Sequence, residues 1–573
     1  MNRHAAIPMH IRRLRENFSS ALPRSRSGFY RHGRKLVRGA LRLPGGATYV
    51  AALGFVVSPF AIVAVHLAML HRPVYLDGDW ALLDVDVRAA LRWHLLLGPY
   101  DRFGWHHPGP AFAYLLSIAA RLIGPGGVAD DLGIVAINAG AALATVVLVR
   151  RRVGRIAALW AAVCLTASCA ILGPGNLVTA WGPNVVFLPV VLLTVLCADA
   201  ASSHKNSLVG ALIVATFEVQ TQLGTAPVVL VLITATVIAL VLRHRKGDRP
   251  TYASGRRYTS FLGWGLLAIM WLPPVVEQLQ HLGQKGGATV ISTLHPNLQQ
   301  VSPRSGNLVA IYHFLIAKHA SHSIGSVMNL LAPNPWMLLL LGGVCLVAIA
   351  VGRRTPDGFA AYLGWMALAI GIMTPLAVTQ VVGTIEGFDL SWDRAVPVVA
   401  ALGAGVSVFV RVPDSPCRLS SRHMAHAPVD TNSRLTFGWT CLRAILLFTA
   451  AAAVGATFAG QMMAWNVHTI SSPVDRAAWR FVRGELRGAP SVRVDALKGS
   501  AYGIAASIAD DLIARGIHVT VPPGWAPEFG AAKVSTGRAA AEVVISSGVC
   551  ITSRGVKCLH KGNGEFELQV IRS

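Results

Sequence analysis

The chain has 573 residues, of which 53% are hydrophobic and only 14% are charged. A soluble protein carries about 25% charged residues, so this composition excludes an ordinary soluble enzyme and indicates an integral membrane protein. The formal net charge of +24 does not indicate nucleic-acid binding, because the basic residues gather before the first apolar block and in short gaps between blocks, which is the positive-inside pattern.

The N-terminal tail, residues 1–48, is rich in arginine and is expected to be disordered on the cytoplasmic side. The apolar block that follows it is too long for a cleavable signal and predicts a retained anchor. Residues 49–470 then read as a multispanning domain, with apolar blocks of roughly 16 to 25 residues that can cross a bilayer as helices. Examples are 48–70, 132–149, 156–172, 226–242, 337–351, 359–377 and 442–464.

The positive-inside rule leaves four gaps for the outer face, namely 71–110, 173–184, 275–334 and 380–394. The alternation closes with about eleven crossing helices and an outer C-terminus if Ala111–Ile123 lies at the interface or re-enters. That block could instead cross if a second weak block, 308–331, crosses with it. We therefore expect an all-α transmembrane bundle of about 11 to 13 helices.

The first outer gap concentrates ionisable side chains, with five of the chain's 27 acidic residues between positions 74 and 110. One interpretation is a solvated loop with an interfacial helix over 80–97. That interpretation leaves the motif Asp77-Gly78-Asp79 and the Gly- and Pro-rich end at 103–110 unexplained, since such residues fix the backbone. A carboxylate at a membrane boundary beside histidines and arginines can act as a general base, and we favour this functional interpretation.

Other polar residues fall at or near the predicted spans. Glu218 and Gln222 share a helical face, and they either hydrogen-bond a helix end or line a cavity. Glu277 follows two prolines at an outer helix end. Trp392 could line a sugar site, although an interfacial belt tryptophan is the stronger expectation. No spacing of Cys and His predicts a metal site.

The composition changes near residue 471, where charged residues and alternating patterns replace the apolar blocks. Residues 471–573 predict a small extracytoplasmic α/β domain of roughly 100 residues. Its expected elements are a helix over 502–515 and strands at 491–495, 517–521, 543–546 and 566–571. Cys550 and Cys558 could form a disulfide if this domain lies outside the cell.

The outer-loop motifs resemble a known family. The sequence GDWAL at Gly78–Leu82 and the sequence GPYDRFGWHHPGP at Gly98–Pro110 are similar to motifs of actinobacterial multispanning proteins. An aspartate just after the first transmembrane helix is typical of the GT-C superfamily of membrane glycosyltransferases. Weaker similarity continues through most of the chain, although Gln222 stands where relatives have a histidine and Gly182 interrupts their W-N-P motif.

The resemblance implies a GT-C-like fold and a sugar donor linked to polyprenyl phosphate. It implies that Asp79 is the general base, with Asp77 as the second candidate, and that Arg102, His106 and His107 bind the phosphate or orient the base. The candidate substrate-binding residues are Arg102, Trp105, His106, His107, Glu218, Gln222 and Glu277. No cofactor is assigned, and the use of a divalent cation stays open.

The expected partners are the lipid-linked sugar, a cell-envelope glycan or glycolipid acceptor, and membrane lipid, with no nucleic acid. The expected location is the plasma membrane, with many spans and a cytoplasmic N-terminus. Two other functions compete with the transferase. A transporter or lipid flippase would use Glu218 and Glu386 as relay residues, and a non-catalytic envelope scaffold would tolerate loss of Asp79.

Overall fold

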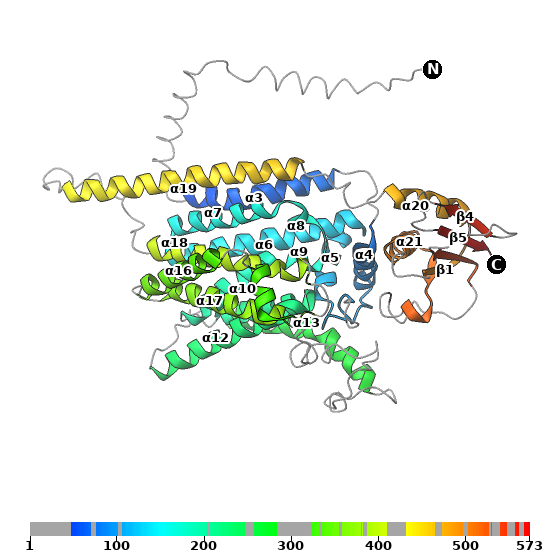
Figure 1. Cartoon of the computed structure of the whole chain (residues 1–573), viewed down its shortest axis with the longest axis horizontal. Helices are drawn as coiled ribbons and strands as arrows, with labels where there is room; N and C mark the ends of the chain where they lie inside the picture. The colour runs from blue at the N-terminus through cyan, green and yellow to red at the C-terminus, as the bar shows by residue number, and fades with distance from the viewer. Residues whose placement is uncertain are drawn as a thin grey trace, which may run out of the picture.

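The computed structural model confirms the predicted architecture, a bundle of apolar helices followed by a small sheet domain at the C-terminal end (Figure 1). The structure describes residues 47–69, 76–100, 106–202, 206–246, 257–282, 322–331, 335–353, 358–379, 381, 385, 387–409, 431–464, 473–496, 502–525, 529, 539–546, 556–560 and 567–572. The predicted disorder of the N-terminal tail therefore concerns residues outside this description, apart from its last two positions.

Within the described residues, eight helices are long and apolar enough to cross a membrane. These spans overlap α3 (Ala47–Ala68), α6 (Gly127–Val153), α7 (Arg155–Leu172), α12 (Ala226–Arg245), α13 (Arg257–Leu282), α17 (Phe359–Val378), α18 (Ala395–Phe409) and α19 (Thr431–Ala464). Shorter apolar helices are α5 (Ala111–Ile123), α10 (Phe187–Ala201), α11 (Asn206–Thr221) and α16 (Pro335–Gly352). The chain is thus a multi-pass membrane protein with an all-α spanning part.

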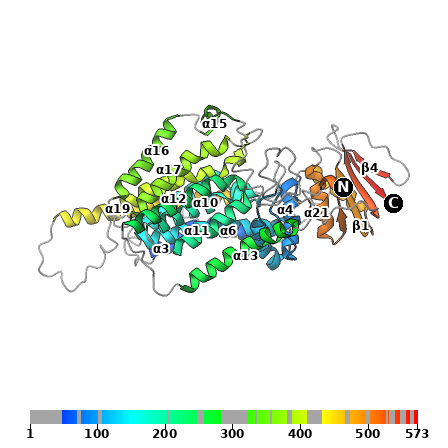
Figure 2. The same cartoon turned by 90° about the horizontal axis from the view of Figure 1, so that it is seen from below.

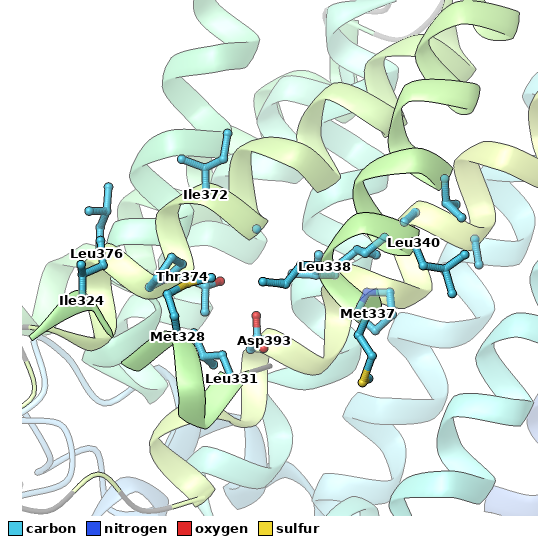
Figure 3. Close-up of a pocket in the computed structure, with 18 residues that line it drawn as sticks. Ile324, Met328, Leu331, Met337, Leu338, Leu340, Ile372, Thr374, Leu376 and Asp393 are labelled. Carbon is cyan, nitrogen blue, oxygen red and sulfur yellow. The ribbon is translucent and has the colours of Figure 1, made fainter. Parts of the chain in front are cut away.

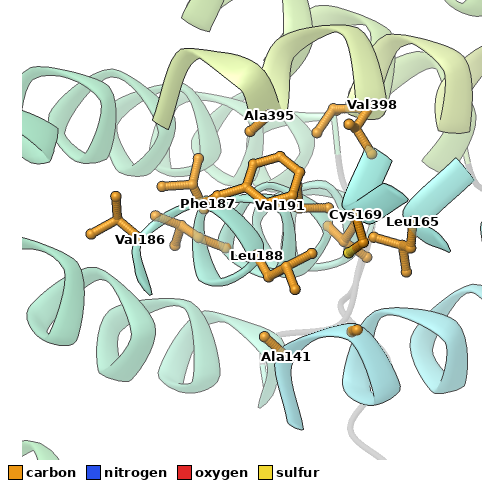
Figure 4. Packing of buried hydrophobic residues seen from close by; sticks show 14 of the residues in the cluster. Ala141, Leu165, Cys169, Val186, Phe187, Leu188, Val191, Ala395 and Val398 are labelled. Carbon is orange, nitrogen blue, oxygen red and sulfur yellow. The ribbon is translucent and has the colours of Figure 1, made fainter. Parts of the chain in front are cut away.

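Helix α10 forms the centre of the bundle core. Its Phe187, Leu188 and Val191 are buried, and they lie among side chains from α6, α7 and α18, such as Ala141 and Leu165 (Figure 4). A helix surrounded by other helices must be apolar on every side, which explains why this segment carries no polar stripe although it is only 15 residues long. By contrast, α13 and α16 expose many large apolar side chains, as helices facing lipid do.

The sequence left open whether the blocks Ala111–Ile123 and 308–331 cross the membrane. The structure describes the first block fully and the second in part. Helix α5 packs against α4 (Gly78–Leu91), α6 and α11, burying Phe112 and Leu116 and exposing Leu122 and Ile123. In the second block the described residues form only the short helix α15 (Ile324–Leu331). Whether α5 crosses the membrane stays a prediction.

The C-terminal domain has a five-stranded mixed sheet with the order β2-β1-β3-β5-β4. Its strands are β1 (Ser491–Ala496), β2 (His518–Thr520), β3 (Ala541–Ser546), β4 (Val556–His560) and β5 (Glu567–Arg572). Strand β1 pairs in parallel with β2 and β3, whereas β5 pairs antiparallel with β3 and β4. Helix α20 (Pro473–Glu485) precedes the sheet, and α21 (Tyr502–Ala514) connects β1 to β2 as predicted, while β4 was not predicted.

The C-terminal domain and the first outer loop share one hydrophobic core. Figures 1 and 2 both show α21 beside α4, at the end of the bundle where α5 also lies. Leu76, Ala81 and Leu82 from the loop are buried in the same cluster as the inner faces of β1, β3 and α21. The loop that carries the candidate base is therefore held by both the bundle and the C-terminal domain.

Candidate active site

Asp79 stands at the start of α4, where the sequence motif Asp77-Gly78-Asp79 begins the helix. Gly78 has a φ of 49°, a conformation that glycine adopts without strain, and it turns the extended chain into the helix. Asp79 is exposed, and the indole Nε1 of Trp181 donates a hydrogen bond to its Oδ2 at 3.3 Å. The Trp181 ring also lies 5.8 Å from the ring of Trp80. Asp79 is thus a solvent-accessible carboxylate with a fixed orientation.

Asp77 has a different environment although it lies two residues away. The C-terminal domain covers it, since a side chain added at Gly503 of α21 would collide with its carboxylate. Burial raises the pKa of Asp77, a backbone hydrogen bond from Gly78 lowers it, and the charge of Asp79 raises it again. The structure therefore gives the exposed position to Asp79 and a covered position to Asp77.

The position of Trp181 depends on a carboxylate that the sequence analysis did not single out. Asp131 near the start of α6 is buried, and its Oδ1 accepts a hydrogen bond from the backbone N–H of Ala180 at 3.0 Å. Ala180 directly precedes Trp181. Asp131 thus fixes the segment that holds Asp79, and the apolar pattern gave no signal for this link because Asp131 lies just before the predicted span.

The described ends of the second loop motif, residues 98–100 and 106–110, pair antiparallel as a hairpin. The backbone N–H of Gly98 donates to the carbonyl of His107 at 3.2 Å, and the N–H of His107 donates to the carbonyl of Pro99 at 2.9 Å. A Cβ at Gly98 would fall 2.6 Å from the carbonyl oxygen of Gly109, so glycine is required where the two segments lie side by side. His106 lies at the hairpin, where its Nδ1 donates to the Gly98 carbonyl at 2.9 Å.

His107 joins this hairpin to the bundle. It is buried, and its Nδ1 accepts a hydrogen bond from the backbone N–H of Leu223 at 3.1 Å. Burial lowers the pKa of the ring to about 4, so His107 is neutral near pH 7. A neutral ring positions the backbone beside Gln222 and supplies no positive charge to a phosphate.

Gln220 is a second anchor of the loop. Its Oε1 accepts a hydrogen bond from the N–H of Ala111 at 3.2 Å, and its Nε2 donates to the carbonyl of Met270 at 3.0 Å. It therefore ties α5, α11 and α13 together behind Gly109, where a Cβ would lie 2.5 Å from the Gln220 amide. The predicted site did not include Gln220 but its neighbour Gln222, which stands where relatives have a histidine.

Gln222 precedes the short helix η1 (Leu223–Thr225) and is half-buried beside two glycines. A Cβ on Gly182 would lie 3.0 Å from the carbonyl of Thr221 and 3.7 Å from Oε1 of Gln222. Gly182 begins α9 (Gly182–Val185), so its small size lets this turn approach the end of α11. The departure from the family's W-N-P pattern thus has a packing reason.

The two predicted glutamates are buried in the helices behind the loop. Glu218 on α11 is 0% exposed, and within the described part of the chain neither of its carboxylate oxygens has a hydrogen-bond partner. Glu277 on α13 is 3% exposed, and α13 packs against α11. A buried carboxylate without a partner is costly in a membrane and is a common mark of function.

Trp392, in the 3-10 helix η4 (Gly387–Arg394), is 1% exposed, so it is not the lipid-facing belt residue that we expected. Within the described residues its Nε1 has no hydrogen-bond partner, and that atom lies 3.9 Å from a Cβ built on Gly224. Trp392 therefore borders the region of Gln222. Arg102, Trp105 and Glu386 lie outside the described residues, among which no group of His, Cys, Asp and Glu is arranged to hold a metal ion.

A buried charge cluster joins the loop, the bundle and the C-terminal domain. Arg88 on α4 bonds Asp84 at 2.6 Å and Asp510 of α21 at 3.5 Å. Asp130 of α6 adds a third carboxylate beside Asp84. Burial and the Asp84 charge raise the pKa of Asp510, while Arg88 lowers it. The sequence gave no sign of this cluster, because its members come from three distant segments.

No protein-family model and no curated protein matches this sequence. Seven solved chains match the structure. One is ArnT from Cupriavidus metallidurans bound to undecaprenyl phosphate, with a TM-score of 0.51 and 13% sequence identity over 90% of this chain and 97% of that chain. Its apo form, also 13% identical with the same coverage, has a TM-score of 0.48. The likeness to the undecaprenyl-phosphate complex confirms the predicted fold class, a polytopic helical bundle with a small sheet domain at its C-terminal end.

Proposed function

We propose that the chain is a membrane glycosyltransferase of the GT-C type that moves a sugar from a polyprenyl-phosphate donor to a hydroxyl of a cell-envelope acceptor on the outer face. The observation that carries the proposal is Asp79, an exposed carboxylate oriented by Trp181 at the end of the bundle where the loop and the C-terminal domain meet. The likeness to ArnT, solved with undecaprenyl phosphate, supports the class of donor.

In the proposed reaction, the Asp79 carboxylate takes the proton of the acceptor hydroxyl. The hydroxyl oxygen forms a bond to the anomeric carbon while the bond from that carbon to the phosphate oxygen breaks, with inversion at the carbon. The polyprenyl phosphate leaves with the electron pair of the broken bond. Neutral His107 and Gln220 hold the loop in place, and the proposed binding residues His106, Gln222, Glu218 and Glu277 lie on or behind it.

Two observations support an outer location for the site. The basic last turns of α6 and α12, which the positive-inside rule places in the cytoplasm, contain Arg150–Arg152 and Arg243–Arg245, whereas α4 and α5 lie by the start of α6. Cys558 is disulfide-bonded, and disulfides form in oxidising compartments outside the cytoplasm. The partner of Cys558 lies outside the described residues.

The test measures release of polyprenyl phosphate from radiolabelled polyprenyl-phosphate sugars by the purified protein, with envelope membranes supplying the acceptor. Asp79→Asn should lower kcat by roughly 10²–10⁴-fold, the contribution typical of a general base. Asp86→Asn is the control, because Asp86 is a half-buried carboxyl on the same helix and is not one of the proposed site residues; it should keep turnover. Equal kcat for wild type and Asp79→Asn would contradict the assignment of the base.

The transporter alternative draws on buried Glu218 and predicts a different pattern. Labelled polyprenyl phosphate would cross proteoliposome membranes at a rate that Glu218→Gln abolishes and Asp79→Asn leaves unchanged. Turnover without such crossing would support the transferase.

A further inference from the structure

A large apolar cavity lies between α15, α16, α17 and the start of α18. It has a volume of about 690 Å³, within the range of small-molecule sites, and its walls are almost entirely aliphatic (Figure 3). Met328 comes from α15, Leu338 from α16 and Ile372 from α17. None of the proposed site residues lines it.

The cavity opens toward the bilayer. Several of its lining residues are exposed apolar side chains on helices that lie in the membrane, including Met337 at 60%, Leu340 at 70% and Ile372 at 59%. In a membrane these side chains face lipid, so a ligand can enter the cavity sideways without leaving the hydrocarbon. The occupant that fits this route has a long apolar chain.

The polar residues of the cavity indicate which head group the occupant carries. Figure 3 shows the Asp393 carboxylate pointing into the cavity near Thr374, and Asp393 is the only charged residue among those that line the described cavity. The Asp393 carboxyl has two oxygens, so beside Thr374 it can still form a hydrogen bond with a ligand hydroxyl. None of the described lining residues is Lys or Arg, so a phosphate would be buried there without a counter-charge.

The polar end of the cavity adjoins the candidate active site. Trp392, the residue before Asp393, is buried and borders Gly224. Gln222 lies by the same glycine, with its Nε2 3.6 Å from a Cβ built there. Trp392 thus lies next to Asp393 in the chain and close to the region of Gln222.

We propose that this cavity binds a membrane lipid of the long-chain alcohol class, with its chain between α15, α16 and α17 and its hydroxyl on Asp393. This proposal does not depend on the proposed transferase activity.

The test uses photolabelling of the full chain in lipid nanodiscs. The probes are a diazirine-bearing long-chain alcohol and its phosphate monoester, with labelled peptides identified by mass spectrometry. The alcohol should label peptides of α15, α16 and α17, and should do so about tenfold more than the phosphate, since the described lining offers a buried phosphate no cationic partner. Asp393→Leu, which removes the carboxyl that binds the hydroxyl, should lower alcohol labelling.

Gly371→Leu supplies the steric test, because Gly371 lines the cavity and a Cβ there meets Val396 only at an ordinary 3.6 Å. Filling the cavity should lower alcohol labelling about tenfold or more, since burial of several methylene groups is lost. Gly343→Leu on α16 is the matched control, because Gly343 is exposed and a Cβ there meets nothing within 4 Å. Equal labelling of the two leucine variants, or equal labelling of wild type by alcohol and phosphate, would overturn the proposal.

Discussion

Titration of His107 tests whether the first outer loop is locked to the bundle by a neutral ring. Burial lowers the pKa of His107 from 6.5 to about 4. Since one pKa unit corresponds to about 1.4 kcal/mol, the site disfavours the charged ring by roughly 3 kcal/mol. The native loop is therefore most stable above pH 6.5, where His107 is neutral in both the folded and the unfolded state. As the pH falls from 6.5 through about 4, the unfolded state gains the proton first and the loop loses stability.

The assay is NMR of ¹⁵N-histidine-labelled protein in nanodiscs, with the His107 signal identified by its absence from His107→Asn. The ring should stay neutral at pH 5 and gain its proton near pH 4, together with loss of the hydrogen bond to Leu223. The exposed His94 serves as the reference signal. A His107 signal that titrates near 6.5 would refute the reasoning, because it would mean that the ring reaches water.

Two variants separate the contribution of the His107 hydrogen bond to loop stability from the contribution of the size of its ring. Asn at position 107 can still accept the Leu223 N–H, whereas His107→Leu leaves that buried donor unpaired, at a cost of about 1–3 kcal/mol. Hydrogen exchange at the Leu223 amide should therefore be faster in His107→Leu than in His107→Asn. Equal exchange rates would show that the Nδ1 contact contributes nothing to the stability of the loop.

Two further predictions concern the docking of α21 and the packing of α18. Burial and the Asp84 charge raise the pKa of Asp510, so docking of α21 should be tightest near pH 4 and should weaken as the pH rises through the raised pKa. Hydrogen exchange of α21 measures this dependence, and Asp510→Asn should flatten it. Parallel pH profiles for wild type and variant would contradict the prediction. Gly405→Ala should destabilise the bundle by about 1–3 kcal/mol in thermal unfolding in detergent, because the added Cβ collides with the Trp160 indole. Gly140→Ala, where a Cβ meets nothing within 4 Å, is its control, and equal melting temperatures would show that α18 shifts freely.

The sequence predicted the spanning helices well, because lipid imposes long apolar segments regardless of tertiary detail. It placed the ends of these segments less well. The predicted span 132–149 begins after the acidic pair Asp130–Asp131, whereas α6 begins at Gly127 and buries both carboxylates. Their partners, Ala180 and the cluster around Asp84, come from other parts of the chain, and no local pattern announces them.

The sequence could propose candidate site residues, but it could not give the environment of each one. Local motifs placed Asp77 and Asp79 together, but only the fold shows that the C-terminal domain covers one and leaves the other exposed. Trp392 fitted a membrane-interface belt by its place in the sequence, and its burial follows from the packing of η4 against α10 and α17. Side chains whose environment is built by distant segments are the ones that a single sequence cannot assign.

The shared core of α4 and the C-terminal domain has a consequence for biosynthesis. The ribosome makes α4 near the beginning of the chain and α21 near its end, so the apolar side of α4 formed by Ala81 and Leu82 stays uncovered through most of translation. The Asp79 loop acquires its final support only when the last segment has been made and has folded. A chain that stops early therefore yields a bundle whose Asp79 loop lacks the support of α21, and the mature arrangement of this loop depends on completion of the whole chain.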